Sequence, residues 1–469
     1  MKIMLVNPNH RTKLGSSEDI SAILPPLGIC YIAAVLRKQG YEVGIIDMNA
    51  CNYTLQDVSD IISKTKPDIV GITASTPVIF KAFDIAGKVK KIDKNIVTVM
   101  GGAHPTSLPY ECIKNKNIDI VVYGEGELTM LEICKKLEKK KSLKGTKGLL
   151  YKNKGKIVTN SPRPLIKNLD ELPFPAIDIL PLNKYYSAYT KHAKFANILT
   201  SRGCPGRCVY CNKLIFGYNV RLRSAENIFK EIKYLHDNYG YVEFHIVDDL
   251  FTQDRDRVLK FCQLIKQSGM KIFWKLGNGV RVGSVDYELL KKMKESGCYS
   301  ISFGIESGNQ QILNNIKKGQ TLKMCKDAVE WANKLGIFTI GFFMIGNLGE
   351  NEKTIRDTIE FAKSLPLDVA QFSILVPFPG TEIRGIIEKT GKIFESNWAS
   401  YDNIEGKAIF EHGQLTKEMM ERMHKQAYHE FYMRPKFIIG RIFKTRSLIE
   451  FKKQLIGFIA ILGLLFRKN

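Results

Sequence analysis

The residues of this sequence best suited to chemistry are three closely spaced cysteines. The stretch SRGCPGRCVYC (201–211) contains Cys204, Cys208 and Cys211, four and three residues apart. Cysteine thiolates bind zinc or iron–sulfur clusters. A structural zinc site needs a closed set of four ligands, usually from two paired ligand turns. The sequence has no second CxxC and no HxxxH, and His192 and His245 stand alone.

Three thiolates on one short loop favour a cubane 4Fe–4S cluster in which one iron has no protein ligand. Gly203, Pro205 and Gly206 would let such a loop wrap closely around a cluster. A site with all its ligands in place would be structural, whereas an open iron marks a place for a reacting molecule. Zinc binding and cysteines without any ligand remain the alternatives at this point.

Six β/α units follow in the sequence and must position this loop. From residue 195, six apolar strand candidates are separated by helical stretches: KFANILTSRGC, YVEFHIVDD, KIFWKLGNG, YSISFGIES, FTIGFFMIG and VAQFSILVPF. Six such units make three-quarters of an eight-fold barrel, where functional residues lie at the carboxyl ends of strands. We therefore expect a partial (β/α)6 barrel over 191–400, with Asp248, Asp249 and Glu306 at strand ends.

The first 134 residues alternate short apolar strands with amphipathic helices. Continuous apolar runs such as MKIMLV and DIVGITAS are typical of strands buried on both faces. Their spacing predicts a doubly wound, flavodoxin-like parallel sheet over 1–134, with Thr73 and Gly101–Gly102 at strand ends. We expect a hairpin at 148–159 and a proline-rich connector within 135–190. Residues 401–469 are expected to be helical, without strands.

The cysteine loop resembles the CxxxCxxC signature of the radical S-adenosylmethionine enzymes. Tyr210 matches an aromatic residue of that signature, GIESG (304–308) is similar to a stretch common in these families, and the six units match their partial barrel. The resemblance implies that Cys204, Cys208 and Cys211 hold a 4Fe–4S cluster whose open iron binds S-adenosyl-L-methionine. Reductive cleavage then gives a 5′-deoxyadenosyl radical, which takes a hydrogen atom from the substrate. The electron would come from a reductase of flavodoxin or ferredoxin type.

The same resemblance suggests cosubstrate contacts for four other residues. These are Tyr210, Asp248, Asp249 and Glu306. For Asp249 the alternative is a helix N-cap for the following turn. Glu306 ends an apolar strand and would be costly to bury unpaired, so its alternative is a carboxylate with a partner in the core. Arg281 would pair with either a carboxylate or the backbone.

The first domain resembles the cobalamin-binding domains that precede radical S-adenosylmethionine barrels. The matching pieces are ILPPLG (23–28), DIVGITAS (68–75), VMGGAHP (99–105) and DIVVYGEGE (119–127). The resemblance makes Thr73, Ser75, Gly101 and Gly102 candidates for binding the nucleotide tail of cobalamin. Glycines there would let the backbone approach the ligand.

One motif departs from that pattern. Where relatives carry a cobalt-ligating Asp-x-His-x-x-Gly element, this sequence has NPNHRTKLG, with His10 one residue out of place. We therefore expect no lower histidine ligand on cobalt, and surface or supporting roles for His10 and His104. The alternative for the whole domain is a flavodoxin-like module without a cofactor.

The chain as a whole resembles cobalamin-dependent radical S-adenosylmethionine enzymes. Some relatives methylate unactivated carbon, while others include an anaerobic cyclase of bacteriochlorophyll synthesis and a ring-contracting enzyme of hopanoid synthesis. We expect methyl transfer to a small-molecule or lipid-like substrate, with a radical oxidoreductase or cyclase as the alternative. RNA methylthiolation is disfavoured because the sequence predicts no small β-barrel RNA module and has no second cysteine triad, so no nucleic acid is expected as a partner. A cobalamin or redox sensor would need an output domain that the sequence does not predict.

Composition places the chain among globular proteins of a reducing compartment. The net charge of +23 favours an anionic partner, but the lysines are spread along the chain, as on a solvated surface. The seven other cysteines stand singly in apolar surroundings, as reduced core residues do. The first residues, MKIMLVNPNH, predict a strand and not a signal peptide. These features predict a cytoplasmic protein.

The carboxyl-terminal residues are both basic and apolar. Residues 434–469 hold nine Lys or Arg and one acidic residue, around the uncharged run LIGFIAILGLLF (455–466). As a helix this run would span about 18 Å, too short for a bilayer core of about 30 Å. It predicts either a helix packed over the barrel or peripheral contact with an anionic membrane.

Overall fold

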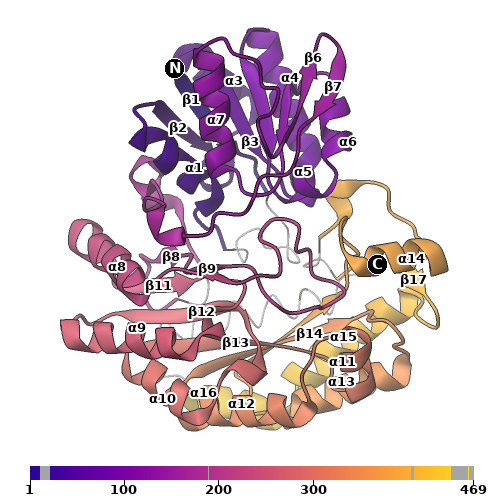
Figure 1. Cartoon of the computed structure of the whole chain (residues 1–469). Coiled ribbons are helices and arrows are strands. Elements are labelled where there is room, and N and C mark those ends of the chain that lie inside the picture. The colour runs from indigo at the N-terminus through magenta and orange to yellow at the C-terminus, as the bar shows by residue number, and fades with distance from the viewer. Residues whose placement is uncertain (11–21, 188–189, 403–405, 445–462, 464–469) are drawn as a thin grey trace.

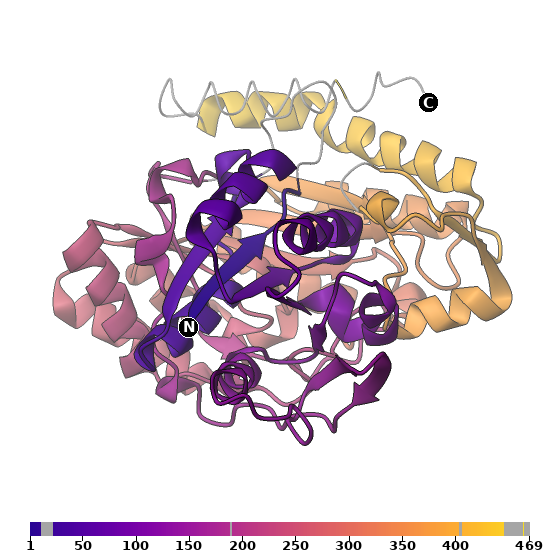
Figure 2. The ribbon, with the colours of Figure 1, turned by 90° about the horizontal axis from the view of Figure 1, so that it is seen from above.

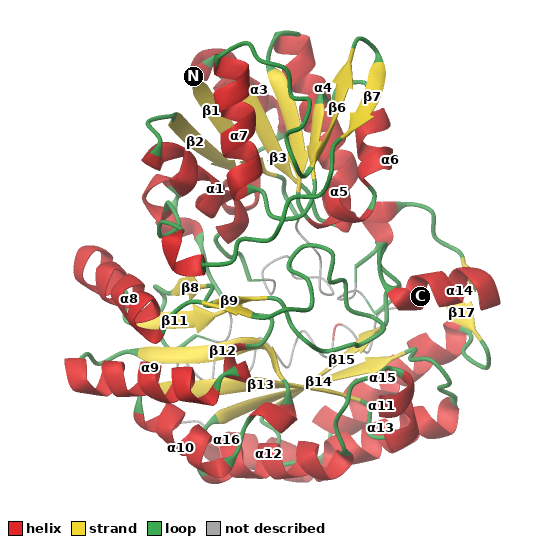
Figure 3. Cartoon of the chain, in the orientation of Figure 1, coloured by secondary structure: helices red, strands yellow, loops and turns green. Residues whose placement is uncertain are grey.

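Two α/β parts and a carboxyl-terminal helical region make up the protein. The computed structural model describes residues 1–10, 22–187, 190–402, 406–444 and 463. Figure 1 shows the amino-terminal sheet and its helices stacked above the partial barrel, and Figure 3 shows how helices flank the strands in both parts. The α/β class predicted from the sequence is confirmed.

The amino-terminal part is a seven-stranded sheet in the order β2-β1-β3-β4-β5-β6-β7. Its strands are β1 (Lys2–Asn7), β2 (Glu42–Asp47), β3 (Ile69–Thr73), β4 (Val97–Gly101), β5 (Ile120–Val122), β6 (Leu149–Asn153) and β7 (Lys156–Thr159). Its helices are α1 (Leu27–Lys38), α2 (Met48–Cys51), α3 (Leu55–Thr65), α4 (Ile79–Ile92), α5 (Ala103–Ser107), α6 (Pro109–Lys114) and α7 (Glu127–Glu138). The parallel order 2-1-3-4-5 is that of flavodoxin-like folds, as the sequence predicted.

Alternating side chains along β1 explain why its apolar run is continuous. Ile3 and Leu5 join the core beneath α1 and α7, whereas Met4 and Val6 join the core beneath α3 and α4. A strand covered by helices on both faces needs apolar residues at every position. Because the strands are parallel, their carboxyl ends share one edge, where Thr73 pairs in register with Gly101.

The predicted hairpin at 148–159 forms and extends the first sheet. Strand β6 pairs antiparallel with β5, and β7 pairs antiparallel with β6, so the sheet continues to Thr159. The proline-rich connector then contains only short 3-10 turns, η2 (Leu169–Glu171), η3 (Ile177–Ile179) and η4 (Leu182–Lys184), within its described residues. Tyr185 ties the connector to the end of β2, because its hydroxyl donates to Asp47 Oδ2 at 2.7 Å.

The second part is an open barrel of six parallel strands in the order β15-β14-β13-β12-β11-β8. Its strands are β8 (Ala196–Ile198), β11 (Glu243–Ile246), β12 (Phe273–Val280), β13 (Cys298–Glu306), β14 (Phe338–Ile345) and β15 (Val369–Ile374). Its helices are α8 (Ala225–Tyr239), α9 (Arg255–Ser268), α10 (Tyr287–Glu295), α11 (Gln310–Asn315), α12 (Leu322–Lys334) and α13 (Glu352–Ser364). All six predicted strands are present.

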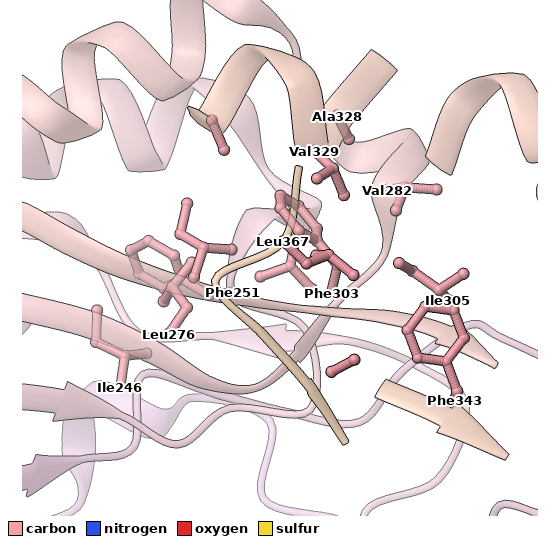
Figure 4. Close-up of a cluster of buried hydrophobic side chains, with 14 of the residues drawn as sticks. Ile246, Phe251, Leu276, Val282, Phe303, Ile305, Ala328, Val329, Phe343 and Leu367 are labelled. Atoms are coloured by element: carbon pink, nitrogen blue, oxygen red, sulfur yellow. The ribbon is translucent and has the colours of Figure 1, made fainter. Parts of the chain in front are cut away.

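Apolar side chains fill the space between the barrel strands and the surrounding helices. Figure 4 shows part of this cluster, in which Ala328 and Val329 of α12 lie near Phe303 of β13. Trp274 of β12 is fully buried in the same core. Such close packing fixes the strands, and therefore the residues at their carboxyl ends.

A two-stranded ribbon, β9 (Ser201–Arg202) and β10 (Arg221–Leu222), carries the cysteines on the loop between its strands. Residues 203–220 form this connection, which we call the cysteine loop. The ribbon follows β8 directly. The loop is thus held at the carboxyl end of the first barrel strand, as the barrel hypothesis predicted.

The carboxyl-terminal region covers the open side of the barrel. It consists of α14 (Glu382–Thr390), β16 (Gly391–Ile393), η7 (Trp398–Ser400), β17 (Phe410–His412), α15 (Lys417–Tyr432) and α16 (Pro435–Lys444). Tyr432 of α15 bonds to both the N–H and the C=O of Ala370, which satisfies polar groups of the edge strand β15. Figure 2 shows α15 and α16 running along one side of the molecule.

One prediction for this region was wrong. Strand β17 pairs antiparallel with β16, although no strand was expected after residue 400. Its three residues are too few to show an alternating pattern. The apolar run 455–466 lies outside the described residues. Among the described helices, none is long and apolar enough to cross a membrane.

Candidate active site between the two sheets

The cysteine loop is held in a closely packed conformation. Cys204 is buried, while Cys208 and Cys211 are half-buried. Gly203 has φ +89°, and a Cβ atom there would lie 2.4 Å from the carbonyl oxygen of Asn219. Only glycine fits such a position, which confirms the need for this residue in the loop.

Two of the three thiols lie beside open space. No three His, Cys, Asp or Glu side chains of the described residues lie close enough together to share one metal ion. In a 4Fe–4S cluster each cysteine binds a different iron. Cys208 and Cys211 line a cavity of about 360 Å³. The space beside two of the three thiols leaves room for a cluster ligated by this loop.

Charge near the loop favours thiolate at Cys208. A hydrogen bond from Cys211 lowers the pKa of Cys208 to about 6, against the effect of burial, and the nearby Lys318 ammonium lowers it further. A thiolate is the form that binds iron. Of the two hydrogen-bonded thiols, Cys208 is therefore the one that more readily becomes a thiolate.

A buried lysine joins two of the predicted cosubstrate residues. Lys318 Nζ lies 2.8 Å from Glu306 Oε1 and 3.1 Å from the Tyr210 hydroxyl. Burial alone would lower the pKa of Lys318, but Glu306 and Cys208 raise it, so the ammonium stays charged. Glu306 has φ +70°, a strained value for a residue with a side chain. Glu306 thus has a partner, and its cosubstrate contact stays a prediction.

Lys318 was missed by the sequence reasoning. It lies in KKGQ (317–320) and looks there like one of two solvated lysines. The neighbouring Lys317 is indeed half-exposed and pairs with Glu382. Nothing in a single sequence distinguishes the two lysines, because only the fold turns one of them inward.

Asp248 and Asp249 both support the chain around the cysteine loop. Asp248 accepts hydrogen bonds from Thr200 N at 2.5 Å and from Ser201 Oγ at 2.7 Å, and burial raises the pKa of its carboxyl. Asp249 Oδ2 accepts from Gly203 N at 3.1 Å. The N-cap alternative for Asp249 is wrong, because the N-cap residue of the following turn η5 (Phe251–Gln253) is Leu250 and no side chain caps that turn. A contact of either residue with cosubstrate stays a prediction.

Arg281 binds the backbone. Its Nη2 donates to the carbonyl of Lys318 at 2.9 Å, and its guanidinium lies against Gly206 of the cysteine loop. Of the two partners considered, the structure shows the backbone. Arg281 therefore links the segment that carries Lys318 to the loop.

The predicted cobalamin-binding residues meet at the edge of the first sheet. Thr73 and Gly101 end neighbouring strands, and Gly102 has φ +109°. A Cβ atom on Gly102 would lie 2.8 Å from the carbonyl oxygen of Ala74 and 3.0 Å from Thr73 Oγ1. The contacts of the chain itself therefore require glycine at this position.

The side chains at this edge fit a polar ligand group. Among the described residues, none hydrogen-bonds the Thr73 hydroxyl, and Ser75 is exposed. Hydroxyls and closely spaced backbone groups at strand ends are what the nucleotide tail of a cofactor needs. Their direct role in binding cobalamin stays a prediction.

The two histidines of this part contact side chains of the chain itself. His104 is fully buried, with Nδ1 3.3 Å from Thr76 Oγ1 and Nε2 3.5 Å from Glu111 Oε1. Burial lowers its pKa, and its ring packs edge-on against Trp398 of η7. His10 Nε2 lies 3.7 Å from Asp402 Oδ2. Each ring is thus engaged with the chain itself.

The cysteine loop and the first sheet touch directly. Asn212, next to Cys211, donates from Nδ2 to Ser107 Oγ at 2.7 Å and to the carbonyl of Pro379 at 2.9 Å. Ser107 ends α5, which begins directly after Gly102. The candidate cluster ligands therefore lie beside the edge that holds the candidate cobalamin residues.

Comparison with known families agrees with this division. The family described as B12 binding domain matches residues 18–134, and the radical SAM superfamily matches residues 198–362. The first matched range includes Thr73, Gly101 and Gly102 at the carboxyl ends of the strands, and the second includes the cysteine loop. Each match covers less than half of the chain.

Three curated relatives are similar over most of their length. An uncharacterized methyltransferase of Pyrococcus horikoshii is 39% identical over 463 residues, 98% of each chain. The cytidylyl-2-hydroxyethylphosphonate methyltransferase of Streptomyces wedmorensis is 31% identical, over 81% of this chain and 80% of the relative. The anaerobic magnesium-protoporphyrin IX monomethyl ester cyclase of Rubrivivax gelatinosus is 27% identical, over 97% of this chain and 81% of the relative.

A solved structure has the same fold throughout. It is the radical S-adenosylmethionine methyltransferase TsrM of Kitasatospora setae, with cobalamin and a 4Fe–4S cluster bound. The match has a TM-score of 0.73 and 16% identity, and covers 98% of each chain. At that identity the likeness shows the fold alone.

Proposed function

Because the chain belongs to the family of cobalamin-dependent radical S-adenosylmethionine methyltransferases, we propose that it methylates an unactivated carbon of a small-molecule or lipid-like substrate. The observation that supports this most is the contact between Asn212 of the cysteine loop and Ser107 of α5. It holds the candidate cluster site against the candidate cobalamin site. A reaction that needs both cofactors requires such proximity.

The chain's own residues would bind and orient the reacting groups. Cys204, Cys208 and Cys211 would hold three irons of a 4Fe–4S cluster and leave the fourth for S-adenosyl-L-methionine. Bound there, these groups supply a radical that removes a hydrogen atom from the substrate, and cobalamin supplies the methyl group. Lys318 keeps positive charge between Tyr210 and Glu306, next to the thiols.

Two of the named relatives support a small-molecule substrate. The Streptomyces wedmorensis relative is named for cytidylyl-2-hydroxyethylphosphonate, and the Rubrivivax gelatinosus relative for a magnesium-porphyrin ester. The cavity of about 360 Å³ beside Cys208 and Cys211 would admit part of such a molecule together with the cosubstrate. We propose no nucleic-acid partner.

Anaerobic reconstitution tests the proposal. We expect about four irons and four labile sulfides per chain, together with bound cobalamin. Cys208→Ala should abolish formation of 5′-deoxyadenosine, with Cys262→Ala, which changes a cysteine of the barrel core, as the control. Retained formation in the Cys208 variant would refute the radical assignment.

The second candidate function is a cyclase or oxidoreductase reaction without net methyl transfer. The similarity to the Rubrivivax gelatinosus cyclase, over 97% of this chain, supports it. S-adenosylhomocysteine separates the two candidates, because methyl transfer produces it and cyclisation does not. A strain that lacks the protein should accumulate the substrate and should lack the product. A methylated product would support methyl transfer, whereas a cyclised product would support the cyclase reaction.

We propose that a flavodoxin or ferredoxin delivers the electron at the rim of the cavity. Arg207 is exposed and stacks on Tyr218, with its guanidinium 4.0 Å from the ring centroid, and Lys213 lines the same cavity. Basic side chains steer acidic partners. Arg207→Glu should slow turnover supported by an acidic flavodoxin and spare turnover supported by reduced methyl viologen. Equal loss with both reductants would argue against docking there.

We also propose peripheral contact with an anionic membrane through α16, and location in the cytoplasm. Ile438 and Ile439 are 37% and 53% exposed, and Lys436 is exposed beside them. Apolar side chains next to basic ones suit the interface of an anionic bilayer. Ile438→Ser with Ile439→Ser should reduce binding to phosphatidylglycerol vesicles. Binding equal to that of the unaltered protein would contradict the proposal.

A further inference from the structure

The base of the cysteine loop is bound to the first domain by four charged side chains. We call this cluster the Glu125 clamp: Glu125, Glu127, Arg202 and Arg221. Arg202 and Arg221 are register partners on β9 and β10, the two strands that the cysteine loop connects. Glu125 and Glu127 come from the segment after β5 of the first sheet.

Both ends of the loop bind the same carboxylate. Arg202 Nη1 donates to Glu125 Oε1 at 2.8 Å, and its Nη2 donates to Glu127 Oε1 at 2.5 Å. Arg221 Nη1 lies 2.8 Å and 2.9 Å from the two oxygens of Glu125. The side chains of the clamp are only 3% to 10% exposed. Two guanidinium groups and two carboxylates balance in charge, as a buried cluster requires.

Further contacts leave the clamp little freedom to move. The backbone N–H of Ile166 donates to Glu125 Oε2 at 2.7 Å, and Arg221 donates to the carbonyl of Ile166 at 2.8 Å. The Arg202 guanidinium lies over the Tyr31 ring of α1, 5.4 Å from its centroid. Glu125 is thus held by the connector as well as by both arginines.

The clamp also adjoins the candidate cobalamin edge. Gly124, the residue before Glu125, donates from N to Thr106 Oγ1 of α5 at 3.1 Å. On the other side, Arg202 lies two residues before Cys204. The clamp therefore connects the helix that follows Gly102 with the start of the cysteine motif, by a route separate from the Asn212–Ser107 contact.

We propose that the Glu125 clamp is a positioning device that sets the distance and orientation between the cluster and cobalamin. The inference rests on the proposed function, since it concerns the placement of those two cofactors. Without the Glu125 charge both arginines lose a partner at once. The loop then moves relative to the first sheet while each domain keeps its own core.

The test uses Glu125→Gln, which keeps the volume of the side chain and removes its charge, and Arg221→Lys as a second variant. Glu243→Gln is the matched control. The Glu243 side chain is fully buried and pairs with His245 of its own strand, and it accepts a hydrogen bond from Tyr299 of β13, so its partners lie within the barrel. Hydrogen exchange followed by mass spectrometry measures how often the backbone amides of segments 124–127 and 203–220 open to solvent. In reconstituted protein, the magnetic coupling between the reduced cluster and cob(II)alamin measures the distance between these two centres.

We expect exchange in both segments to rise at least about tenfold in the Glu125 variant and not in the control. At unchanged iron and cobalamin content, the magnetic coupling should spread over a range of values. Unchanged exchange and coupling in both variants, or an equal change in the control, would overturn the inference. If Glu125→Gln does not fold, Arg221→Lys decides alone. If the unaltered protein binds no cobalamin, the proposed function fails, and the exchange data still decide on the clamp.

Discussion

Replacing Lys318 by methionine removes the cation that lies between Glu306 and Tyr210 and leaves a carboxylate without its partner. The Lys318 and Glu306 side chains are only 9% and 13% exposed, and their charged atoms are 2.8 Å apart. At an effective dielectric constant of about 20 the gross attraction is about 6 kcal/mol, most of which offsets the cost of burying two charges. We therefore expect Lys318→Met to lower the free energy of unfolding by about 3–5 kcal/mol.

A double-variant cycle separates this interaction from lost packing. Lys318→Met combined with Glu306→Gln removes both charges, so we expect it to cost only about 1–2 kcal/mol. Urea titration of metal-free, reduced protein would be followed by tryptophan fluorescence, because Trp274 is fully buried in the barrel core. If the double variant is no more stable than the single one, the two charges do not stabilise each other and the reasoning fails.

Three further predictions concern Glu350, Gly102 and Asp249. Burial raises the pKa of Glu350 to about 7. Its protonated form is the one the fold favours, so its contribution to stability is full below about pH 4.5 and is lost as the pH rises through about 7. Between pH 4.5 and pH 8 the free energy of unfolding of Glu350→Gln should therefore rise by up to about 3 kcal/mol relative to that of the unaltered protein. A difference in free energy of unfolding that does not change with pH would contradict this. Gly102→Ala should destabilise the first sheet by about 2–4 kcal/mol in the same urea assay, because its Cβ would lie 2.8 Å from the Ala74 carbonyl at φ +109°; Gly28→Ala, which meets no atom within 4 Å, is the control. Asp249→Ala should lower the iron content after reconstitution without unfolding the barrel, since it frees Gly203 N; full iron content would show that the loop keeps its shape without this bond.

The fold was predictable because its signals are repeated along the chain. Most of the parallel strands are short, largely apolar runs that end near a small or polar residue, and twelve or more residues separate one parallel strand from the next. Strand β17 lacked any such signal, because three residues cannot show a period. The pairing of β6 with β5 could likewise not be predicted, because the sequence pattern of a hairpin does not indicate which sheet the hairpin joins.

The site was predictable only where chemistry restricts the residue types. The spacing of Cys204, Cys208 and Cys211 has few uses besides metal binding. Charged residues that act by pairing across the fold gave no signal. Glu125 and Lys318 look like ordinary surface residues in GEGE and KKGQ, and both are buried by partners far away in sequence. Asp248 was placed correctly at a strand end, but its bonds to Thr200 and Ser201 were not foreseen.

The position of the Glu125 clamp along the chain has a consequence for synthesis. Glu125 and Glu127 belong to the first domain, whose sheet ends at Thr159, and this domain leaves the ribosome well before Arg202 and the cysteines. Domains fold from the amino terminus as the chain emerges. We therefore expect the first domain to be folded when the cysteine loop is made, and to be the surface on which that loop closes.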